Sequence, residues 1–311
     1  MKYFTGTDQG LDLRQVNSAV EQAFADHGRG LVQMPPKTYV TLPQGDFRTM
    51  PAYLPSLNIA GVKVVNVHPD NPSRGLPTVM AITVLLDVAT GKPEAVINAT
   101  RLTDMRTGAA GAVAAKYLSP KKEIVMGVIG TGRQAQAQVR ATAQELAIRE
   151  MKVWSRNHVH AEKFCTMFRE TECRCARAEQ ACDCDVLVTT TPSRQPIVSD
   201  EWVHEGTHIN AIGADAPGKE ELDPAILSRA SVFVDDIVQA VHSGEINVPI
   251  KNGLFKEADI AGTLGEVVIG RKKRRRPGEI TVFDSTGLAI QDLAIAKIAM
   301  HHGTAIVLPF P

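Results

Sequence analysis

The 311-residue sequence has no excess of charge of either sign and no long apolar run. Its 34 basic and 34 acidic side chains cancel, so no global field attracts the chain to nucleic acid or to a membrane surface. No apolar run is long enough to span a bilayer, and the N-terminus lacks a basic segment followed by an apolar core. We therefore expect a cytoplasmic protein with neither a membrane nor a nucleic-acid partner.

Cysteine is also scarce, and its five copies lie close together at Cys165, Cys173, Cys175, Cys182 and Cys184. An odd number argues against a disulfide framework, and the Cys-x-Cys spacings differ from the Cys-x2-Cys knuckles of zinc sites. We expect reduced thiols and no metal. The one concentrated charge, residues 271–276, precedes a turn at Pro277-Gly278, which favours a solvated loop over a phosphate-binding patch.

The sequence does contain a glycine turn between an apparent strand and a helix. The apolar run 124–129 leads into Gly130-Thr131-Gly132 and then into a segment rich in alanine and glutamine. Gly130 permits a tight turn, Gly132 lets the backbone approach a diphosphate, and Ala135 allows the helix to pack on the strand. Strand, turn and helix in this order predict a dinucleotide pyrophosphate site.

Strands and helices alternate strictly after residue 118. We predict strands over residues 124–129, 151–154, 185–191, 208–213, 231–235 and 280–284, with helices over 133–147 and 158–170. This alternation predicts an α/β domain over residues 116–289, with a doubly wound parallel sheet of the Rossmann type. Ligands collect at the carboxyl ends of such strands, where Thr189, Asp215, Asp235 and Asp284 stand.

Residues 1–115 follow another pattern and predict a separate α+β domain. Strands are expected over residues 32–40, 47–50, 61–66, 78–87 and 93–98, between an opening helix at about 12–27 and an Ala/Gly-rich helix at about 103–117. A C-terminal helix within about 290–311 is assigned to the same domain.

Several segments of the sequence resemble one known family, in the same order along the chain. They are residues 61–66, 102–110, 130–135, 208–219 and 284–292. The resemblance is to the ornithine cyclodeaminase/μ-crystallin family, most closely to its archaeal alanine dehydrogenase branch. It implies a Rossmann domain and a sheet-based domain that both dimerises and lines the active site. It also implies hydride transfer between a nicotinamide and the Cα of an amino acid, through an imine.

Oxidation of an amino acid requires a grip on its carboxylate and a group that takes up the ammonium proton. Lys37, Lys63 and Arg106 can form a cationic pocket, and the resemblance places Lys63 and Arg106 where the family holds the carboxylate. The alternatives to this pocket are that Lys37 is a solvated strand residue and that Arg106 forms a salt bridge on a helix surface. By resemblance Asp215 manages the amine proton, which suits a carboxylate whose pKa a partly dry pocket raises; helix capping is the alternative. Lys63 and Asp215 are the catalytic candidates.

Arg48 bears on the choice of substrate. Cyclodeaminases usually carry a glutamate two residues before the Met-Pro pair that stands here at Met50-Pro51, and Arg48 occupies that position. A guanidinium repels the distal ammonium of ornithine, so the charge favours a small monoamino acid or its keto acid. A solvent-facing Arg48 is the alternative.

The second strand of the predicted Rossmann domain ends without the acid that NAD enzymes use to hold the ribose 2′-hydroxyl. Ser155 and Arg156 stand there and can bind a 2′-phosphate, assisted by Arg133, so NADP(H) is favoured over NAD(H). Further cofactor contacts are expected from the glycine loop and the strand ends. They are Thr107, Gly130, Gly132, Gln134, Ala135, Thr190, Thr191, Pro192, Ile212, Gly213, Ala214, Ser285 and Thr286.

Together these features predict an NAD(P)-dependent alanine dehydrogenase that acts on a small amino acid or keto acid and forms a homodimer. Two other enzymes stay open: an ornithine cyclodeaminase that uses NAD+ catalytically, and an NADPH-dependent ketimine reductase. A different class is a protein that binds NADPH and thyroid hormone, as μ-crystallins do. The presence of Lys63, Arg106 and Asp215 favours an enzyme.

Overall fold

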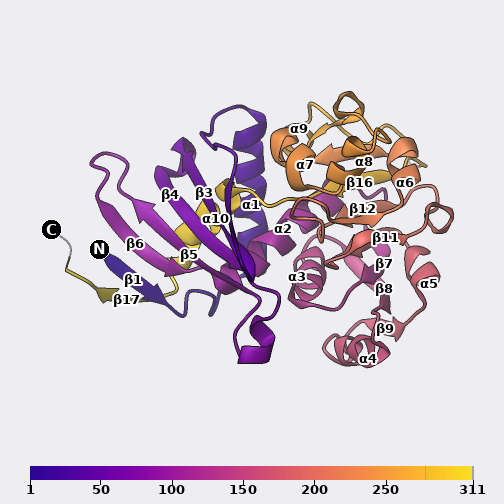
Figure 1. Ribbon diagram of the computed structural model, residues 1–311, viewed down its shortest axis with the longest axis horizontal. Helices are drawn as coiled ribbons and strands as arrows, with labels where there is room; N and C mark the ends of the chain where they lie inside the picture. Colours follow the sequence, from indigo (N-terminus) through magenta and orange to yellow (C-terminus); the bar gives the residue numbers. More distant parts are fainter. Residues whose placement is uncertain (277, 310–311) are drawn as a thin grey trace. The chain divides into compact units, whose positions relative to one another are not determined.

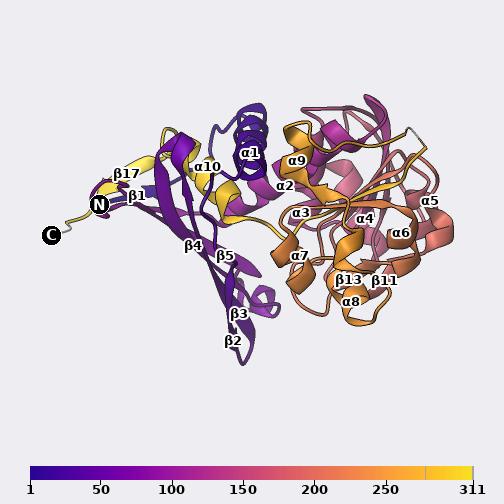
Figure 2. The ribbon, with the colours of Figure 1, turned by 90° about the horizontal axis from the view of Figure 1, so that it is seen from above.

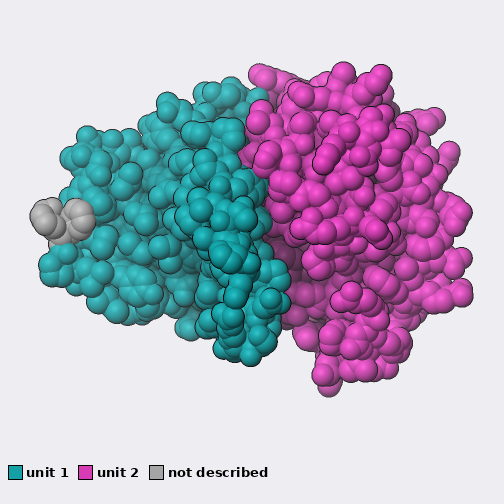
Figure 3. Space-filling view, viewed as in Figure 1, with its two compact units in different colours: residues 1–106, 288–311 teal, residues 107–287 magenta. Residues whose placement is uncertain are grey.

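The computed structural model describes residues 1–276 and 278–309 and divides into two compact units. Unit 1 comprises Met1–Arg106 and Leu288–Pro311, and unit 2 comprises Thr107–Gly287 (Figure 3). The first division falls inside helix α2 (Thr100–Leu118). Over the described residues, no helix combines the length and the apolar character needed to cross a membrane.

Unit 1 is built on a seven-stranded sheet with the order β17-β1-β6-β5-β4-β3-β2. Strands β1 and β6 pair in parallel, and the other neighbours are antiparallel. The strands are β1 (Lys2–Thr5), β2 (Thr38–Leu42), β3 (Gly45–Leu54), β4 (Ile59–Val67), β5 (Val79–Leu86), β6 (Pro93–Asn98) and β17 (Thr304–Val307). Besides α2, the helices are α1 (Leu13–Gly28) and α10 (Ala289–Ala299), with short 3-10 turns at Pro55–Leu57 and Asn71–Arg74.

Helix α10 packs against α1 and against β3, β4 and β5, and Figure 2 shows α1 and α10 on the same side of this sheet. Because side chains alternate along a strand, every second residue is buried from Arg48 to Leu54 in β3 and from Ile59 to Val65 in β4. The buried set includes the charged Arg48 and Lys63 as well as the apolar Met50 and Val65. The face of the sheet that meets α10 therefore carries cations within an apolar layer.

Unit 2 is an eight-stranded sheet with the order β15-β14-β16-β12-β10-β7-β8-β9, in which every neighbouring pair is parallel (Figure 1). The strands are β7 (Glu123–Ile129), β8 (Ala147–Trp154), β9 (Glu172–Cys175), β10 (Val186–Thr189), β12 (His208–Ala211), β14 (Ser231–Val234), β15 (Gly262–Thr263) and β16 (Thr281–Asp284). This arrangement confirms the predicted Rossmann-type α/β fold. The strand order reverses between β7 and β10, which is where such folds bind ligands.

Helices connect these parallel strands. They are α3 (Arg133–Thr142), α4 (His158–Thr166), α5 (Ala178–Cys182), α6 (Pro224–Arg229), α7 (Ile237–Ser243), α8 (Asn247–Lys251) and α9 (Leu264–Val268). Two further strands, β11 (Arg194–Val198) and β13 (Glu220–Leu222), form a separate small sheet, and 3-10 turns lie at Asp200–Trp202 and Glu257–Asp259. All four residues of both β10 and β12 are buried, as expected for strands covered on both faces.

Several predicted elements end at other residues in the structure. The strand expected over residues 32–40 begins only at Thr38, because prolines at 35 and 36 cannot donate hydrogen bonds to a neighbouring strand. The helices expected to reach residues 147 and 170 end at Thr142 and Thr166. The C-terminal helix expected within residues 290–311 ends at Ala299 and is followed by β17; residues 310 and 311 lie outside the described residues.

Two expectations about side chains of unit 2 are wrong in part. Cys165 and Cys173 form a disulfide, with Cα atoms 5.3 Å apart, whereas reduced thiols were expected. Within the basic run 271–276, Arg274 is half-buried and donates to the carbonyls of Leu118 and Gly206 at 2.6 and 3.2 Å, so it fastens backbone segments together. The other members of the run are exposed, as predicted for a solvated loop. Pro277, part of the predicted turn, lies outside the described residues.

Candidate functional site

The glycine turn between β7 and α3 has the backbone geometry expected of a phosphate cradle. Gly130 has a φ of +98°, and a Cβ on it would lie 2.8 Å from Thr190 Oγ1. Gly132 is the N-cap of α3, and nothing lies within 4 Å of the position that its Cβ would take. No described side chain caps this helix. Its first N–H groups and the open space beside Gly132 suit an anion.

A cavity of about 580 Å³ lies at the carboxyl ends of β7, β8 and β10. Predicted cofactor residues from three separate segments line it: Gly130, Gly132, Ser155, Arg156, Thr190, Thr191 and Pro192. The sequence did not single out the rest of the lining: Thr131, Trp154, Asn157, His160, Ser193 and Ile197. Its size falls within the range of small-molecule and cofactor sites.

The end of β8 brings a hydroxyl and a guanidinium to this cavity. Ser155 is half-buried and accepts a hydrogen bond from Thr131 Oγ1 at 3.3 Å, whereas Arg156 is exposed. Asn157 caps α4 by accepting from Val159 N at 3.1 Å. An anionic group at this strand end would therefore meet a donor hydroxyl and a cation.

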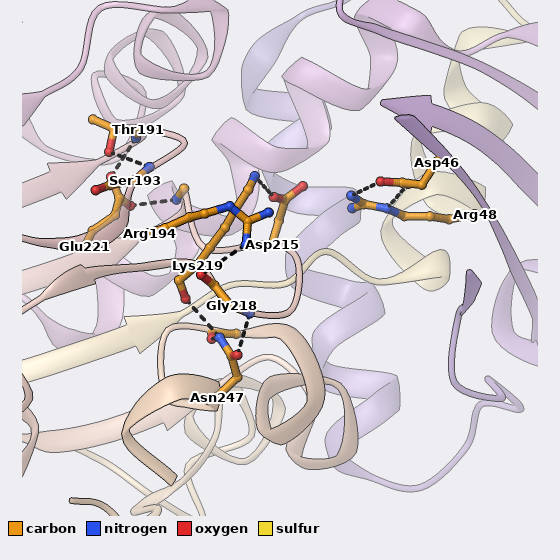
Figure 4. Close-up of polar contacts among 12 residues, drawn as sticks. Asp46, Arg48, Thr191, Ser193, Arg194, Asp215, Gly218, Lys219, Glu221 and Asn247 are labelled. Atoms are coloured by element: carbon orange, nitrogen blue, oxygen red, sulfur yellow. Dashed lines mark hydrogen bonds and ion pairs between the residues drawn. The ribbon is translucent and has the colours of Figure 1, made fainter. Parts of the chain in front are cut away.

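A buried glutamate joins two loops at the carboxyl edge of unit 2. Glu221 Oε1 accepts from Thr191 N at 2.6 Å, and Oε2 accepts from Gly213 N at 2.9 Å (Figure 4). A Cβ on Gly213 would lie 2.2 Å from Thr191 O, so only glycine permits this approach. Burial raises the pKa of Glu221, and that of the neighbouring Glu245 still further. Glu245 Oε1 accepts from the backbone N–H of Glu221 at 2.7 Å and so fixes β13.

The loop after β12 presents Asp215, whose carboxylate is paired with an ammonium. Lys219 Nζ lies 2.6 Å from Asp215 Oδ1, and the Asp215 side chain is 34% exposed (Figure 4). Asn247 holds the loop: its Oδ1 accepts from Gly218 N at 2.9 Å, and its Nδ2 donates to Lys219 O at 2.9 Å. Asp215 does not cap a helix, because the next helix, α6, is capped by Asp223.

Asp235 organises the segment that follows β16. Its carboxylate accepts from the backbone N–H groups of Thr286 and Gly287, both at 2.7 Å, and from Thr286 Oγ1 at 3.0 Å. Ser285 is buried, and its Oγ has no described hydrogen-bond partner. These contacts fix the backbone where Ser285 and Thr286 were predicted to meet the cofactor.

Nine predicted cofactor residues are outside the lining of the 580 Å³ cavity. They are Thr107, Arg133, Gln134, Ala135, Ile212, Gly213, Ala214, Ser285 and Thr286. Arg133 and Gln134 form the first turn of α3, directly after the glycine turn. Ala135 is buried against the sheet, as the packing role predicted for it requires. Thr107 is buried on α2, where its carbonyl accepts from Gln138 at 2.8 Å.

The predicted substrate residues lie in unit 1, where Lys63, Arg106 and Asp292 form a buried ionic cluster. Lys63 Nζ donates to Asp292 Oδ1 at 2.7 Å, and Arg106 Nε donates to the same oxygen at 3.0 Å. Arg106 Nη1 also donates to Gln291 Oε1 at 2.9 Å. Lys63, Arg106 and Asp292 are 1%, 6% and 3% exposed. Two cations thus share one buried anion, and the alternative of a salt bridge on the helix surface does not hold for Arg106, because its salt bridge is in the interior.

The electrostatics of this cluster place the charge change of Lys63 near neutral pH. Burial lowers the pKa of Lys63 to about 7, and the charges of Arg106 and, more weakly, Lys37 act in the same direction. The charge of Asp292 and its hydrogen bond oppose this by raising the pKa. Burial is the largest of these effects, as expected for an amine removed from water.

Lys37 and Arg48 are buried as well, at 8% and 5% exposure, so neither faces solvent. Arg48 Nε donates to Asp46 Oδ1 at 2.8 Å and Nη2 donates to Asp46 Oδ2 at 3.3 Å (Figure 4). The ring of Tyr39 lies 5.1 Å from the Arg48 guanidinium carbon and 5.8 Å from Lys37 Nζ. An ion pair and an aromatic face therefore hold Arg48 in place.

Four residues that shape these sites were not predicted as functional: Asp46, Lys219, Glu221 and Asp292. Two of them carry a local signal in the sequence. Asp46 is two residues before Arg48 and so shares its face of the strand, and Lys219 follows Asp215 by four residues. Glu221 and Asp292 have no such signal, because their partners are distant in the chain.

Comparison with known proteins assigns the chain to one family. The model of the ornithine cyclodeaminase/mu-crystallin family matches residues 2–303. An alanine dehydrogenase from Archaeoglobus fulgidus is 50% identical, covering 93% of this chain and 90% of the relative. The solved structure of an archaeal alanine dehydrogenase dimer with bound NAD has a TM-score of 0.95 at 47% identity, covering 99% of each chain. Thermococcus litoralis Δ1-pyrroline-2-carboxylate reductase, solved with NADH and L-proline, has a TM-score of 0.94 at 34% identity, covering 98% of this chain and 100% of its own.

Proposed function

Because the chain belongs to the ornithine cyclodeaminase/mu-crystallin family, we propose that it is an NAD(P)-dependent alanine dehydrogenase. In the oxidative direction, L-alanine, water and the oxidised cofactor give pyruvate, ammonium, the reduced cofactor and a proton. The high identity to an archaeal alanine dehydrogenase over most of both chains supports this activity. The bound dinucleotide supplies the nicotinamide ring that accepts the hydride from the substrate Cα.

The observation that carries the substrate assignment is the buried cationic cluster of unit 1. Lys63 and Arg106 share the single negative charge of Asp292, so the cluster has one positive charge in excess when Lys63 is in its ammonium form. A substrate carboxylate supplies the missing negative charge. Arg48, paired with Asp46, stands where cyclodeaminases carry a carboxylate, so this position offers no acid to the distal ammonium of a diamino acid such as ornithine.

Asp215 is our candidate for the group that takes up the proton of the substrate ammonium. Its carboxylate is partly exposed, and Lys219 Nζ at 2.6 Å holds it in one orientation. Loss of one ammonium proton and of the hydride leaves an iminium ion, which water hydrolyses to pyruvate and ammonium. A carboxylate in this role contributes about a hundredfold to ten-thousandfold to the rate.

The cavity of unit 2 is our proposed dinucleotide site. We propose that the turn at Gly130 and Gly132 binds the diphosphate. The loop that contains Thr191, which is held by its hydrogen bond to Glu221, would pass beneath the cofactor. Ser155 and Arg156 at the end of β8 favour the 2′-phosphate of NADP(H), because a hydroxyl and a guanidinium stand where NAD enzymes carry an acid. The two solved relatives named above contain NAD and NADH, so the preference for NADP(H) is proposed from Ser155 and Arg156 alone.

We further propose that the protein is a homodimer that uses the sheet of unit 1. One face of this sheet packs against α10, while Val40 and Ile82 on its strands are 44% and 45% exposed. Exposed apolar residues on a sheet favour association with a second copy. Light scattering during gel filtration measures the mass in solution; a monomer at micromolar concentration would contradict the dimer.

The activity is tested by following reduced-nicotinamide absorbance in purified protein given pyruvate and ammonium, with NADH and NADPH in separate samples. Parallel samples contain ornithine with NAD+, assayed for proline, and Δ1-pyrroline-2-carboxylate with NADPH. We expect pyruvate-dependent oxidation of the cofactor, which needs ammonium. Proline formation without net redox change would identify a cyclodeaminase instead, and reduction of the cyclic imine alone would identify a ketimine reductase.

A further inference from the structure

Asp292 is the one acid that contacts both cations of the proposed carboxylate pocket among the described residues. We propose that Asp292 is a positioning residue for substrate recognition, which fixes the orientation of Lys63 and Arg106 and favours the ammonium form of Lys63. This inference rests on the proposed function in one respect, namely that Lys63 and Arg106 bind a carboxylate.

The contacts of Asp292 connect three elements at a single oxygen atom. Lys63 comes from β4 and Arg106 from α2, while Asp292 lies in the first turn of α10. Asp292 Oδ1 accepts hydrogen bonds from Lys63 Nζ at 2.7 Å and from Arg106 Nε at 3.0 Å. Gln291 Oε1 accepts one from Arg106 Nη1 at 2.9 Å. Two long and flexible side chains are thereby ordered before any ligand binds, which lowers the entropic cost of binding.

The same contacts leave donors for a ligand. Lys63 Nζ makes one hydrogen bond to the described residues, and Arg106 makes none through Nη2. The second oxygen of Asp292, Oδ2, is buried and has no hydrogen-bond partner among the described residues. A cation pair held by one oxygen of a neighbouring acid, with further N–H groups unused, is suited to receive a second carboxylate.

The charged groups around Lys63 show why the charge of Asp292 matters. Arg106 and Lys37 are cationic and oppose the ammonium form of Lys63, whereas Asp292 favours it. On β3, Arg48 is paired with Asp46, and β5 carries no ionisable side chain. The other charged residue of α10, Lys297, is more than one turn beyond Asp292. Asp292 is thus the anion that offsets both burial and the neighbouring cations.

Replacing Asp292 by asparagine removes this charge at nearly constant volume. The pKa of Lys63, about 7 in the wild type, then falls further, because burial and the charges of Arg106 and Lys37 are no longer opposed. If carboxylate binding needs the ammonium form, affinity falls about tenfold per pH unit above that pKa. In D292N this fall begins at a lower pH than in the wild type, and at pH 7.5 binding is about tenfold weaker.

The test measures the Kd of propionate, a monocarboxylate that can be neither aminated nor reduced, by isothermal titration calorimetry with the reduced cofactor present. Wild type, D292N and D292E are compared from pH 5.5 to 8.5. D292E keeps the charge but moves the carboxylate by one methylene, so it should weaken binding several-fold with an unchanged pH midpoint. The matched control is D26N, because Asp26 is another buried acid of unit 1, bonded to Gln22 at 2.9 Å on α1. D26N should bind propionate as the wild type does.

A wild-type pH midpoint in D292N would overturn the charge role, and a wild-type Kd in D292E would overturn the positioning role. If D292N does not fold, D292E still tests the positioning role. The charge role would then be contradicted by a wild-type Kd that does not change across pH 7. Pyruvate reduction is assayed in the same samples. Its absence alongside normal propionate binding would contradict the proposed function only, whereas absence of propionate binding at every pH would contradict both.

Discussion

Replacing Lys63 by methionine should stabilise the folded protein at neutral pH while abolishing carboxylate binding. The pKa of Lys63 is about 7 in the folded protein, against 10.5 for an ordinary lysine. Since the folded-state pKa is the lower one, the unfolded chain binds more protons between pH 7 and 10.5. The stability of the wild type therefore rises with pH across this window. Below pH 7 the full penalty for burying the charged amine is present.

The magnitude follows from the two pKa values. The difference between 10.5 and about 7 corresponds to about 5 kcal/mol of destabilisation at pH 6 and about 2 kcal/mol at pH 9. Methionine removes this penalty at similar volume but leaves Asp292 with one cation fewer, which costs about 1–3 kcal/mol. We expect K63M to be more stable than the wild type by about 2–4 kcal/mol at pH 6. This advantage should shrink by about 2–3 kcal/mol by pH 9.

The assay is urea denaturation of both proteins at pH 6, 7.5 and 9, with the free energy of unfolding obtained by linear extrapolation. Thr83→Val is the matched control, because Thr83 is opposite Lys63 in the β4–β5 register, is fully buried and does not ionise. Its stability difference from the wild type should not change with pH. A K63M advantage that is equally independent of pH would refute the assignment of a depressed amine pKa to Lys63.

Three further predictions concern unit 2. Asp215→Asn should lower kcat at least about a hundredfold with an unchanged cofactor Kd by fluorescence titration; undiminished turnover would rule out a role in proton transfer. Arg156→Ala should weaken NADPH about tenfold or more and leave NADH unchanged, and an equal effect on both cofactors would mean that no 2′-phosphate is bound there. Arg274→Ala should lower the free energy of unfolding by about 2–4 kcal/mol, against about 0.5 kcal/mol or less for the exposed Lys273→Ala; similar values for the two would contradict the structural role of Arg274.

The features that the sequence predicted well are local in the chain. The glycine turn needs only Gly130, Gly132 and the flanking residues, and its strand, turn and helix are continuous in sequence. Ser155 and Arg156 are local as well: they directly follow β8 and line the 580 Å³ cavity, and their contact with a cofactor stays a prediction. The ligand-binding edge of a parallel sheet can also be predicted from the sequence. Each buried apolar run ends in polar residues, and these ends lie at the same edge of the sheet.

Features that depend on long-range pairing were not predictable in this way. Strands β1 and β17 have few residues and little alternation; β17 pairs with β1 at the other end of the chain, and β1 pairs in turn with β6. Lys63 and Asp292 are 229 residues apart, so no spacing rule connects them. Nor did composition predict that Arg274, within a basic run, would bind backbone carbonyls, since that depends on the positions of the end of α2 and of the loop at Gly206.

The burial of Lys63 and Arg106 follows from the chemistry proposed for them. An exposed amine would keep its ammonium form throughout the neutral range and bind a carboxylate weakly, because water competes for both charges. Burial strengthens the attraction but makes the unpaired ammonium costly, and the pKa of about 7 expresses that cost. One shared acid is a compromise between these demands. Two acids would neutralise both cations and leave no charge for a substrate, whereas none would favour a neutral Lys63. With Asp292 alone, the cluster carries one positive charge whenever Lys63 is protonated, which matches the single carboxylate of alanine or pyruvate.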